Sequence, residues 1–311
     1  MRILIVSSYI FGYMVPVVEE LQHRNYDVEI LHYGQGPLYF KYKNALHHGI
    51  SFLKKIIGGH AKKSFREKVL KQRYKNQYFD QILVIHPQYL NKSTNKFLKS
   101  ICDSYKTFFF DSIKKMPEQK RVLSYFDTVF SYEKEDCDNY NFRFVTNFIP
   151  YEKPFILSSK LDFFMICSWD DRISIVQAIA AYLMDQNLKY EFIVFSKKQR
   201  TSTALEVIYK KRNIQDVINK MEHTKAFVDV QRSMQNGLSF RVFEAMGLRK
   251  KLITTNEDIA TYDFYDKRNI LIIDLNAIKI PKEFLETPYR EVPAAIYEQY
   301  TARNFVNKIF D

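Results

Sequence analysis

Glycine is scarce in this chain, with eight residues in 311. Because glycine loses more conformational freedom on folding than any other residue, we expect so few glycines to be kept where the backbone must bend or approach a ligand closely. After Gly59 only Gly237 and Gly247 remain, and they bracket one short segment. Residues 235–247 are therefore the first candidate for such a bend or close approach.

Long apolar runs are missing and cysteine is rare. No run of about 18 apolar residues occurs, so no membrane-spanning helix is predicted. The N-terminus enters a strand-like run at once and has neither the length nor the cleavage site of a signal peptide. The cysteines Cys102, Cys137 and Cys167 are odd in number and widely spaced, which favours reduced thiols over a disulfide framework or a zinc site. We expect a cytoplasmic protein with no metal and no cofactor of its own.

Strand-like runs alternate with helical patterns along both halves of the chain. They lie at residues 3–6, 28–31, 81–85, 107–110, 128–131, 163–167, 191–195, 226–230, 251–255 and 270–274. This alternation predicts the α/β class with doubly wound parallel sheets. Two prolines and a loss of periodicity at residues 148–154 indicate a linker. We expect one Rossmann-like domain over residues 1–150 and a second over residues 151–295.

The segment between residues 226 and 255 combines a strand, a turn and a helix. Gly237 provides the turn, and apolar residues then recur at helical spacing on one side, away from Arg241 and Glu244. In a parallel sheet this order places the turn and the start of the helix at the carboxyl edge, where open α/β folds bind ligands. The plainer alternative is an ordinary turn and a packed helix without a ligand.

This segment resembles the donor-binding motif of GT-B glycosyltransferases, in which a glycine turn leads into a helix containing Glu-Ala-Met. Here the helix reads Phe243-Glu244-Ala245-Met246-Gly247. The resemblance implies that Glu244 accepts hydrogen bonds from the ribose hydroxyls of a nucleotide sugar. The commoner form of the motif has a second glutamate eight residues earlier, where this chain has Asn236. Over residues 225–275 the sequence is similar to a bacterial branch of these enzymes found with capsule, exopolysaccharide and O-antigen genes.

The same resemblance implies an architecture and a division of labour. Two Rossmann-like domains are expected to face each other across a cleft, the first binding the acceptor and the second binding the nucleotide sugar. A C-terminal helix, expected over residues 296–311, is expected to pack back toward the first domain.

Cations and polar side chains near the carboxyl edge of the second sheet are the candidate donor contacts. Negative charge develops on the departing diphosphate, and in the absence of a metal it must be met by cations or helix N-termini. Each candidate taken alone has the alternative of an ordinary surface or loop residue. The expected donor contacts are Glu244, Gly237, Asn236, Ser239, Arg241, Arg172, Lys197, Lys198, Gln231 and Asn256.

His86 and Asp111 are the candidate catalytic residues, because each follows a strand-like run of the first domain. In an inverting enzyme either side chain could take the proton from an acceptor hydroxyl, so they compete for the role of general base. For a retaining enzyme, the resemblance implies instead that His86 contacts the transferred sugar. Their alternatives are a capped loop histidine and a helix-capping aspartate. Gly12 and Tyr13, in the loop after the first strand, are the expected acceptor contacts, although a lone glycine is a weak signal.

One further motif suggests a metal. Asp136-Cys137-Asp138 matches the Asp-x-Asp of metal-dependent GT-A transferases. It lies in an acidic stretch typical of the start of a helix, and the rest of the chain indicates two GT-B-like domains. We therefore interpret the match as accidental and predict a metal-independent reaction.

The net charge of +12 comes mainly from the first half of the chain. Residues 41–75 interleave Lys and Arg with aromatic and aliphatic residues. Such a stretch can lie on an anionic membrane, follow a nucleic-acid backbone or form a solvated helical face. We favour the anionic membrane, since it would bring the enzyme to a lipid-linked acceptor. No zinc-finger, RNP or helix-turn-helix pattern supports a nucleic-acid partner.

The sequence as a whole predicts a cytoplasmic glycosyltransferase, peripheral to the inner face of the cell membrane. It would move a sugar from a nucleotide diphosphate sugar, a UDP-sugar foremost, to a lipid-linked surface glycan. The alternative enzyme is a nucleotide-sugar 2-epimerase of the same architecture, for which more carboxylates and histidines would be expected. A non-enzymatic protein that binds carbohydrate or nucleic acid is the alternative from another class.

Overall fold

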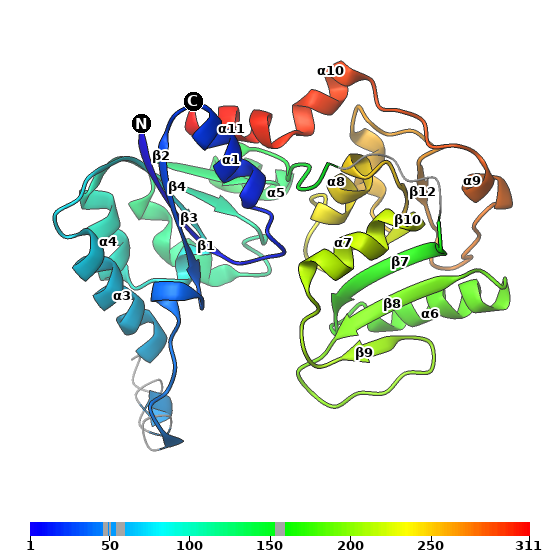
Figure 1. Cartoon of the computed structure of the whole chain (residues 1–311), viewed down its shortest axis with the longest axis horizontal. Coiled ribbons are helices and arrows are strands. Elements are labelled where there is room, and N and C mark those ends of the chain that lie inside the picture. The colour runs from blue at the N-terminus through cyan, green and yellow to red at the C-terminus, as the bar shows by residue number, and fades with distance from the viewer. Residues whose placement is uncertain (46–48, 50, 54–59, 153–158) are drawn as a thin grey trace. The chain divides into compact units, whose positions relative to one another are not determined.

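The chain falls into two compact units, which Figure 1 shows as ribbons. The computed structural model describes residues 1–45, 49, 51–53, 60–152 and 159–311. The first unit comprises residues 1–145 and 306–311, and the second comprises residues 146–305. Within the described residues, each unit is built on a six-stranded sheet whose neighbouring strands pair in parallel. The predicted α/β class with two doubly wound parallel sheets is confirmed.

The first sheet has the strand order β2-β1-β3-β4-β5-β6. Its strands are β1 (Arg2–Ser8), β2 (Asp27–Tyr33), β3 (Phe79–Ile85), β4 (Cys102–Phe109), β5 (Thr128–Ser131) and β6 (Arg143–Phe144). Its helices are α1 (Val15–His23), α3 (Ala61–Tyr74), α4 (Lys92–Ser100) and α5 (Lys134–Tyr140), with 3₁₀ turns η1 (Gly36–Leu38), η2 (Pro87–Tyr89) and η3 (Pro117–Tyr125). Each strand-like run of the first half lies in or overlaps one of β1 to β5. The sequence did not predict β6, because two residues are too few to show alternation.

Helices cover both faces of the first sheet. Successive side chains of a strand point to opposite faces, and Ile82 of β3 packs in one cluster with Leu70 of α3 and Leu98 of α4. Gln81 faces the other side, where its side-chain amide donates to the carbonyl of Phe310 over 2.8 Å. Phe310 ends the last helix, α11 (Ala302–Phe310). Figure 1 accordingly shows α3 and α4 on one side of the sheet and α1 with the end of α11 on the other.

The second sheet has the strand order β12-β11-β10-β7-β8-β9. Its strands are β7 (Leu161–Ser168), β8 (Tyr190–Phe195), β9 (Glu206–Ile208), β10 (Thr224–Asp229), β11 (Lys251–Thr254) and β12 (Ile270–Ile272). The helices of this unit are α6 (Ile173–Asp185), α7 (Ile214–Glu222), α8 (Phe240–Gly247), α9 (Lys282–Glu286) and α10 (Ala294–Tyr297), with 3₁₀ turns η4 (Glu257–Thr261) and η5 (Glu298–Tyr300). No helix within the described ranges is long and apolar enough to cross a membrane.

Helix α8 has one face in the core of the second unit. Val242, Phe243 and Met246 belong to a buried cluster that also contains Phe227 of β10 and Leu252 of β11. The apolar positions recur three and four residues apart, which is the spacing of one face of a helix. Burial of this face fixes the rotation of α8 about its axis, and therefore which way its two charged side chains point.

Gly247 lets residues 149–151 cross α8 at very short range. A Cβ atom at Gly247 would lie 2.1 Å from the carbonyl oxygen of Tyr151 and 2.4 Å from Cγ2 of Ile149. Protein interiors are close-packed, so no side chain fits between these groups. Ile149 cannot easily move, because it is buried and its amide donates to the carbonyl of Tyr300 over 2.8 Å. The close approach at this glycine is therefore to the chain's own backbone, whereas the sequence predicted a bend or an approach to a ligand.

We expect Gly247→Ala to lower the free energy of unfolding by roughly 1–3 kcal/mol or more, because the added methyl group overlaps a backbone carbonyl. Chemical denaturation of the full chain, followed by circular dichroism, measures the change. Gly49→Ala is the matched control, since a methyl group added there meets no atom of the described residues within 4 Å. A Gly247→Ala protein as stable as this control would show that residues 149–151 do not pack on α8 as described.

Candidate functional site

The strand order of each sheet changes direction at one point, which gives one candidate site in each unit. In the second sheet the chain runs from β7 outward to β8 and β9, then returns to the other side of β7 with β10. In the first sheet the same change of direction lies between β1 and β3. Open α/β sheets bind ligands beside the carboxyl ends of the two strands at such a point. The candidate sites are therefore the ends of β7 and β10 in one unit and of β1 and β3 in the other.

The Asp229 carboxylate joins several elements of the site in the second unit. It ends β10, is buried, and accepts a hydrogen bond from the Ser239 hydroxyl over 2.8 Å and another from the Thr254 hydroxyl over 3.3 Å. The Ser239 oxygen in turn accepts from the backbone amide of Arg241 over 3.1 Å and so caps α8. One carboxylate thus ties together the end of β10, the end of β11 and the first turn of α8.

Two amide side chains, those of Gln231 and Asn256, shape the loop between β10 and α8. Gln231 donates to the carbonyl of Gln235 over 2.9 Å, and Asn256 donates to the carbonyl of Asn236 over 2.9 Å. The left-handed residue of this loop is Met234, with a φ of 65°, whereas the sequence placed the turn at Gly237. Gly237 directly follows Asn236, so side-chain hydrogen bonds as well as glycine set the course of this loop.

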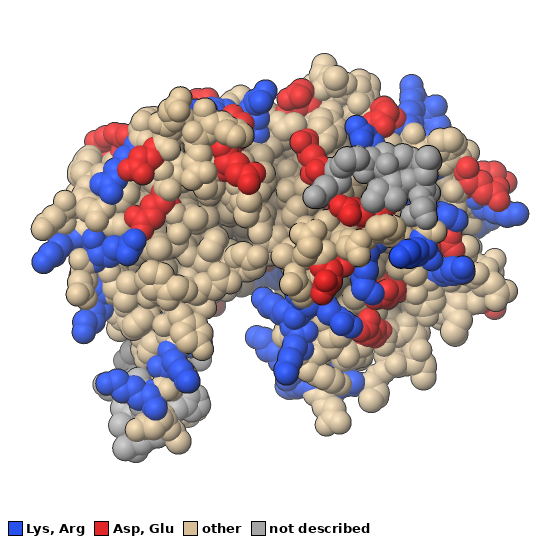
Figure 2. All heavy atoms as spheres, viewed as in Figure 1, with Lys and Arg blue, Asp and Glu red and all other residues tan. Residues whose placement is uncertain are grey.

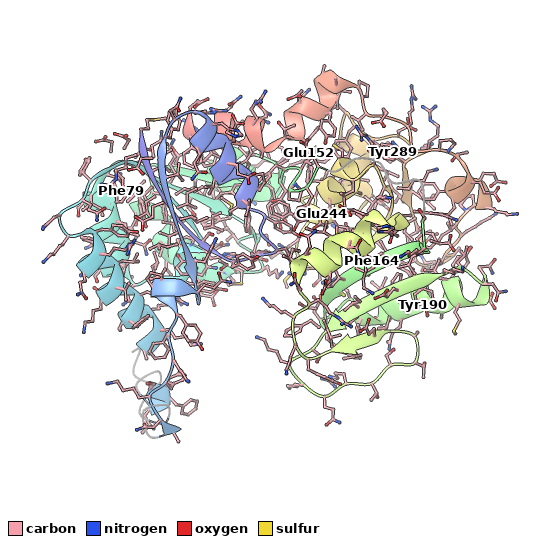
Figure 3. All side chains as sticks on the ribbon, viewed as in Figure 1. Phe79, Glu152, Phe164, Tyr190, Glu244 and Tyr289 are labelled. Atoms are coloured by element: carbon pink, nitrogen blue, oxygen red, sulfur yellow. The ribbon has the colours of Figure 1, made fainter. Side chains whose placement is uncertain are left out.

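Glu244 lies on α8, where Figure 3 labels it, and it is buried. Its carboxylate forms an ion pair with the guanidinium of Arg241 over 2.6 Å. Arg241 also lies over the ring of Phe227, 5.5 Å from its centroid, and donates to the carbonyl of Ile166 at the end of β7 over 3.4 Å. Two residues predicted as separate donor contacts therefore form a single buried pair beside the ends of β7 and β10.

Arg172 is held by the carboxylate of Asp170. Its guanidinium donates to both oxygens of Asp170, over 2.9 and 2.8 Å, and to the carbonyl of Val230 over 3.0 Å. Burial raises the pKa of Asp170, but the bond from Arg172 outweighs it, so the pKa lies below its ordinary value. The Asp170 carboxylate therefore stays ionised and keeps Arg172 oriented. Arg172 links the end of β7 to the end of β10.

Lys197 and Lys198 follow β8, one strand away from the change of winding, and both are exposed. Figure 2 shows Lys and Arg gathered on this part of the second unit, near the ends of β8 and β9. Arg200 lies over the ring of Trp169, 5.6 Å from its centroid, and Trp169 follows β7. The amide of Trp169 donates to the carbonyl of Phe195 over 2.8 Å, which joins the ends of β7 and β8. The structure thus places the two lysines at the rim of the sheet edge rather than beside Arg172.

In the first unit, His86 and Asp111 lie together after β3 and β4. Nε2 of His86 is 3.7 Å from an Asp111 oxygen, and the other Asp111 oxygen pairs with Lys115 over 2.9 Å. Burial raises the pKa of Asp111, while His86 and Lys115 lower it by more, so this carboxylate stays ionised below its usual range. The sequence treated His86 and Asp111 as competing bases, whereas the structure brings them together as a pair. No helix of the described chain begins at Ser112, and the helix-cap alternative is wrong.

The His86 ring is held rigidly. The residue adopts a left-handed backbone conformation with a φ of 59°, and only 6% of its surface is exposed. Its ring stacks on that of Tyr89, with the ring centroids 5.4 Å apart, and lies edge-to-face with the ring of Phe110, with the centroids 5.8 Å apart. Nδ1 is buried and has no hydrogen-bond partner among the residues that the structure describes. A buried polar nitrogen without a partner is costly, so a water molecule or a ligand that bonded to Nδ1 would stabilise it.

The loop after β1 lies at the same change of winding. Gly12 has a φ of 71°, a conformation that side chains disfavour, and Tyr13 is buried with its ring 5.9 Å from that of Phe11. At the end of β1, the Ser7 hydroxyl lies 3.1 Å from Nδ1 of His32. The structure therefore puts the predicted acceptor residues at the sheet edge of the first unit, and Ser7 and His32 are polar neighbours that the sequence did not identify.

The Asp136-Cys137-Asp138 motif lies on α5 and has a structural role. Asp136 is buried and accepts a hydrogen bond from the amide of Ile113 over 2.8 Å, and burial raises its pKa. The Cys137 thiol donates to the carbonyl of Ser131 over 3.6 Å. Among the described residues, no group of three or more His, Cys, Asp or Glu side chains could hold a metal ion.

Comparison with known proteins identifies the fold. No protein-family model matches the chain, and no curated protein matches it. An α-glucosyltransferase solved in complex with UDP and a 13-mer DNA is 9% identical, with a TM-score of 0.58 over 100% of this chain and 96% of that one. The UDP-GlcNAc 2-epimerase of Methanocaldococcus jannaschii, solved with UDP-GlcNAc and UDP, is 9% identical, with a TM-score of 0.54 over 99% of each chain. At such identities the likeness shows the GT-B fold alone.

We expect Arg241→Met to lower the free energy of unfolding by about 3–5 kcal/mol, because it removes the guanidinium that faces the buried Glu244 carboxylate. Adding Glu244→Gln should restore part of that loss, so the two changes should not be additive in chemical denaturation. Arg268→Met is the matched control, since Arg268 pairs with Asp266 but is 54% exposed and should cost less than about 1 kcal/mol. If Arg241→Met costs no more than the control, the pair is not a buried one.

Proposed function

We propose that this chain is a glycosyltransferase that takes a sugar from a nucleotide diphosphate sugar. The observation that carries the proposal is the assembly at the end of β10, where Asp229 fixes both a polar loop and the start of a helix bearing the Arg241–Glu244 pair. The assembly lies where open α/β sheets bind nucleotides. Its helix carries the motif that resembles the donor site of GT-B glycosyltransferases.

The donor would be held entirely by the second unit. Glu244 would accept hydrogen bonds from ribose hydroxyls, and Asn236 would contact the sugar ring in place of the commoner glutamate. The diphosphate would be met by cations and helix N-termini without a metal, through Arg172, Lys197, Lys198 and Arg241. UDP is the favoured nucleotide, because the two solved structures compared above are UDP complexes.

The acceptor would be activated by the first unit. His86 would take the proton of the attacking hydroxyl, and ionised Asp111 would orient the imidazole from 3.7 Å. Gly12 and Tyr13 would contact the acceptor. We propose a lipid-linked surface glycan as the acceptor and a cytoplasmic protein bound at an anionic membrane face. Lys54 and Lys55, part of the basic stretch that suggested this partner, lie outside the described residues.

A nucleotide-sugar 2-epimerase is the second candidate, since one of the similar solved structures is such an enzyme. The two reactions differ in what they require. An epimerase converts its nucleotide sugar with no second substrate, whereas a transferase releases the nucleotide only as the sugar moves to an acceptor or to water.

A thermal-shift screen against UDP, GDP, CMP and dTDP sugars tests donor binding. Incubation of the stabilising nucleotide sugar with the protein alone then separates the two enzymes by chromatography. A new nucleotide sugar indicates the epimerase, and released nucleotide that increases with added glycan acceptor indicates the transferase. Stabilisation by nucleic acid alone would overturn both.

We expect Glu244→Gln to weaken binding of the stabilising nucleotide by about 1.5–3 kcal/mol, because hydrogen bonds to a charged acceptor are lost. Glutamine keeps the volume of the side chain and an acceptor for Arg241, so the fold should survive. Calorimetric titration measures the affinity, and Glu286→Gln, an exposed site in the same unit, is the control. Unchanged affinity in a folded Glu244→Gln protein would remove Glu244 from the donor site.

We expect His86→Gln to lower turnover by about 10²–10⁴-fold, the usual contribution of a general base, with nucleotide affinity unchanged. Asp111→Asn should also lower turnover, and the double variant should be little worse than His86→Gln, because Asp111 acts through His86. His23→Gln, an exposed histidine of the same unit, is the control. Full turnover in His86→Gln would assign the proton transfer to another group.

A further inference from the structure

The first unit contains a cavity of about 430 Å³ beside the start of α3. Basic and tyrosine side chains line most of it: His60, Lys62, Lys63, Arg66, Tyr42 and Tyr89. The basic residues belong to the stretch 41–75, whose composition is compatible with an anionic membrane, a nucleic-acid backbone or solvent. Farther along α3 the same stretch forms ordinary ion pairs, from Lys71 to Glu67 over 2.7 Å and from Arg73 to Glu29 over 2.6 Å.

The positive charge at the cavity is poorly compensated within the unit. The first turn of α3 contains no acidic residue, so Lys62 and Lys63 add to the positive end of the helix dipole. Burial lowers the pKa of Lys63, and the neighbouring charge of Arg66 lowers it further, while exposed Glu118 only partly opposes these effects. Glu67, the acidic residue next to Arg66, is bonded to Lys71 and Asn91 instead.

Arg66 is fixed in a position to bind an anion. Its guanidinium lies 4.8 Å from the ring centroid of Tyr33 and 5.7 Å from that of Tyr89, and it donates to the Tyr89 carbonyl over 2.8 Å. Its Nε is buried and has no hydrogen-bond partner in the part of the chain that the structure describes. Burial lowers the pKa of Arg66, and no carboxylate among the described residues opposes this effect. An oriented guanidinium with an unused donor suits a phosphate oxygen.

Tyr89 connects the cavity to the proposed general base. The Arg66 guanidinium lies 5.7 Å from the centroid of the Tyr89 ring. The His86 ring stacks on the same tyrosine, with the two ring centroids 5.4 Å apart. A ligand whose phosphate group occupies the cavity would therefore extend toward His86 past an aromatic wall. The cavity is larger than one phosphate group needs, which leaves room for the part of the ligand that carries the reacting hydroxyl.

We infer that the α3 cavity binds the phosphate or diphosphate group of the acceptor. Several cations converge on it, the helix N-terminus adds partial positive charge, and the tyrosines offer apolar walls for the adjoining group. The identification as the acceptor site rests on the proposed function. The binding of phosphate rests only on the cavity. The phosphate could belong to a lipid headgroup or to a free phosphorylated compound, and the two share this chemistry.

Hydrogen–deuterium exchange of the full chain with inorganic pyrophosphate tests the inference, because it reports on residues 60–75 separately from the donor site. Pyrophosphate should slow exchange there. In Lys62→Gln/Lys63→Gln the concentration giving half protection should rise at least about tenfold, the loss expected when charge-assisted hydrogen bonds are removed. Lys68→Gln/Lys75→Gln, with the same charge change on exposed positions of α3 or at its end, should match the parent.

Vesicle sedimentation then separates the two sources. Binding to phosphatidylglycerol but not phosphatidylcholine vesicles, displaced by pyrophosphate, supports a lipid headgroup, and pyrophosphate protection without vesicle binding supports a free phosphorylated acceptor. The inference is overturned if residues 60–75 gain no protection, or if the two double variants behave alike. A nucleotide sugar should stabilise Lys62→Gln/Lys63→Gln as much as it stabilises the parent. A failure of the proposed phosphate site can therefore be distinguished from a failure of the proposed donor site.

Discussion

The Asp229 carboxylate is the constraint on which the second unit's site depends. It is fixed by its place at the end of a buried parallel strand, and its bond to Ser239 sets where α8 begins. Because one face of α8 is buried in the core, fixing its start also fixes the direction of Arg241 and Glu244. A site held this way needs little rearrangement when a ligand arrives, so less binding energy is lost to ordering.

The two units differ in whether the arginines at their candidate sites are paired with carboxylates. In the second unit Arg172 and Arg241 each face a carboxylate within 3 Å, so these cations are oriented but already compensated. In the first unit Arg66 lies among tyrosines, and no carboxylate of the described residues compensates its charge. A compensated arginine contributes direction and hydrogen-bond geometry to a ligand, whereas an uncompensated one also contributes net attraction that salt weakens. The first unit therefore offers the stronger electrostatic attraction for an anion.

The sheets and α8 could be predicted from the sequence because their signal is local. Buried parallel strands read as short apolar runs, and α8 shows helical spacing. Strands β6 and β9, with two and three residues, were too short for that signal. The side-chain pairs could not be predicted, since His86 and Asp111 meet only because β3 and β4 are neighbours. The turn at Met234 was missed because hydrogen bonds from Gln231 and Asn256, rather than residue type, set the loop.

The single tryptophan of the chain, Trp169, lies beside the candidate site of the second unit, where a bound ligand would change its fluorescence. Trp169 follows β7 next to Asp170, its amide is tied to Phe195, and Arg200 lies over its ring. Indole emission is sensitive to nearby charge and to the motion of a stacked cation. The protein thus carries its own optical reporter at one sheet edge, and long-wavelength excitation would observe events there without interference from its 22 tyrosines.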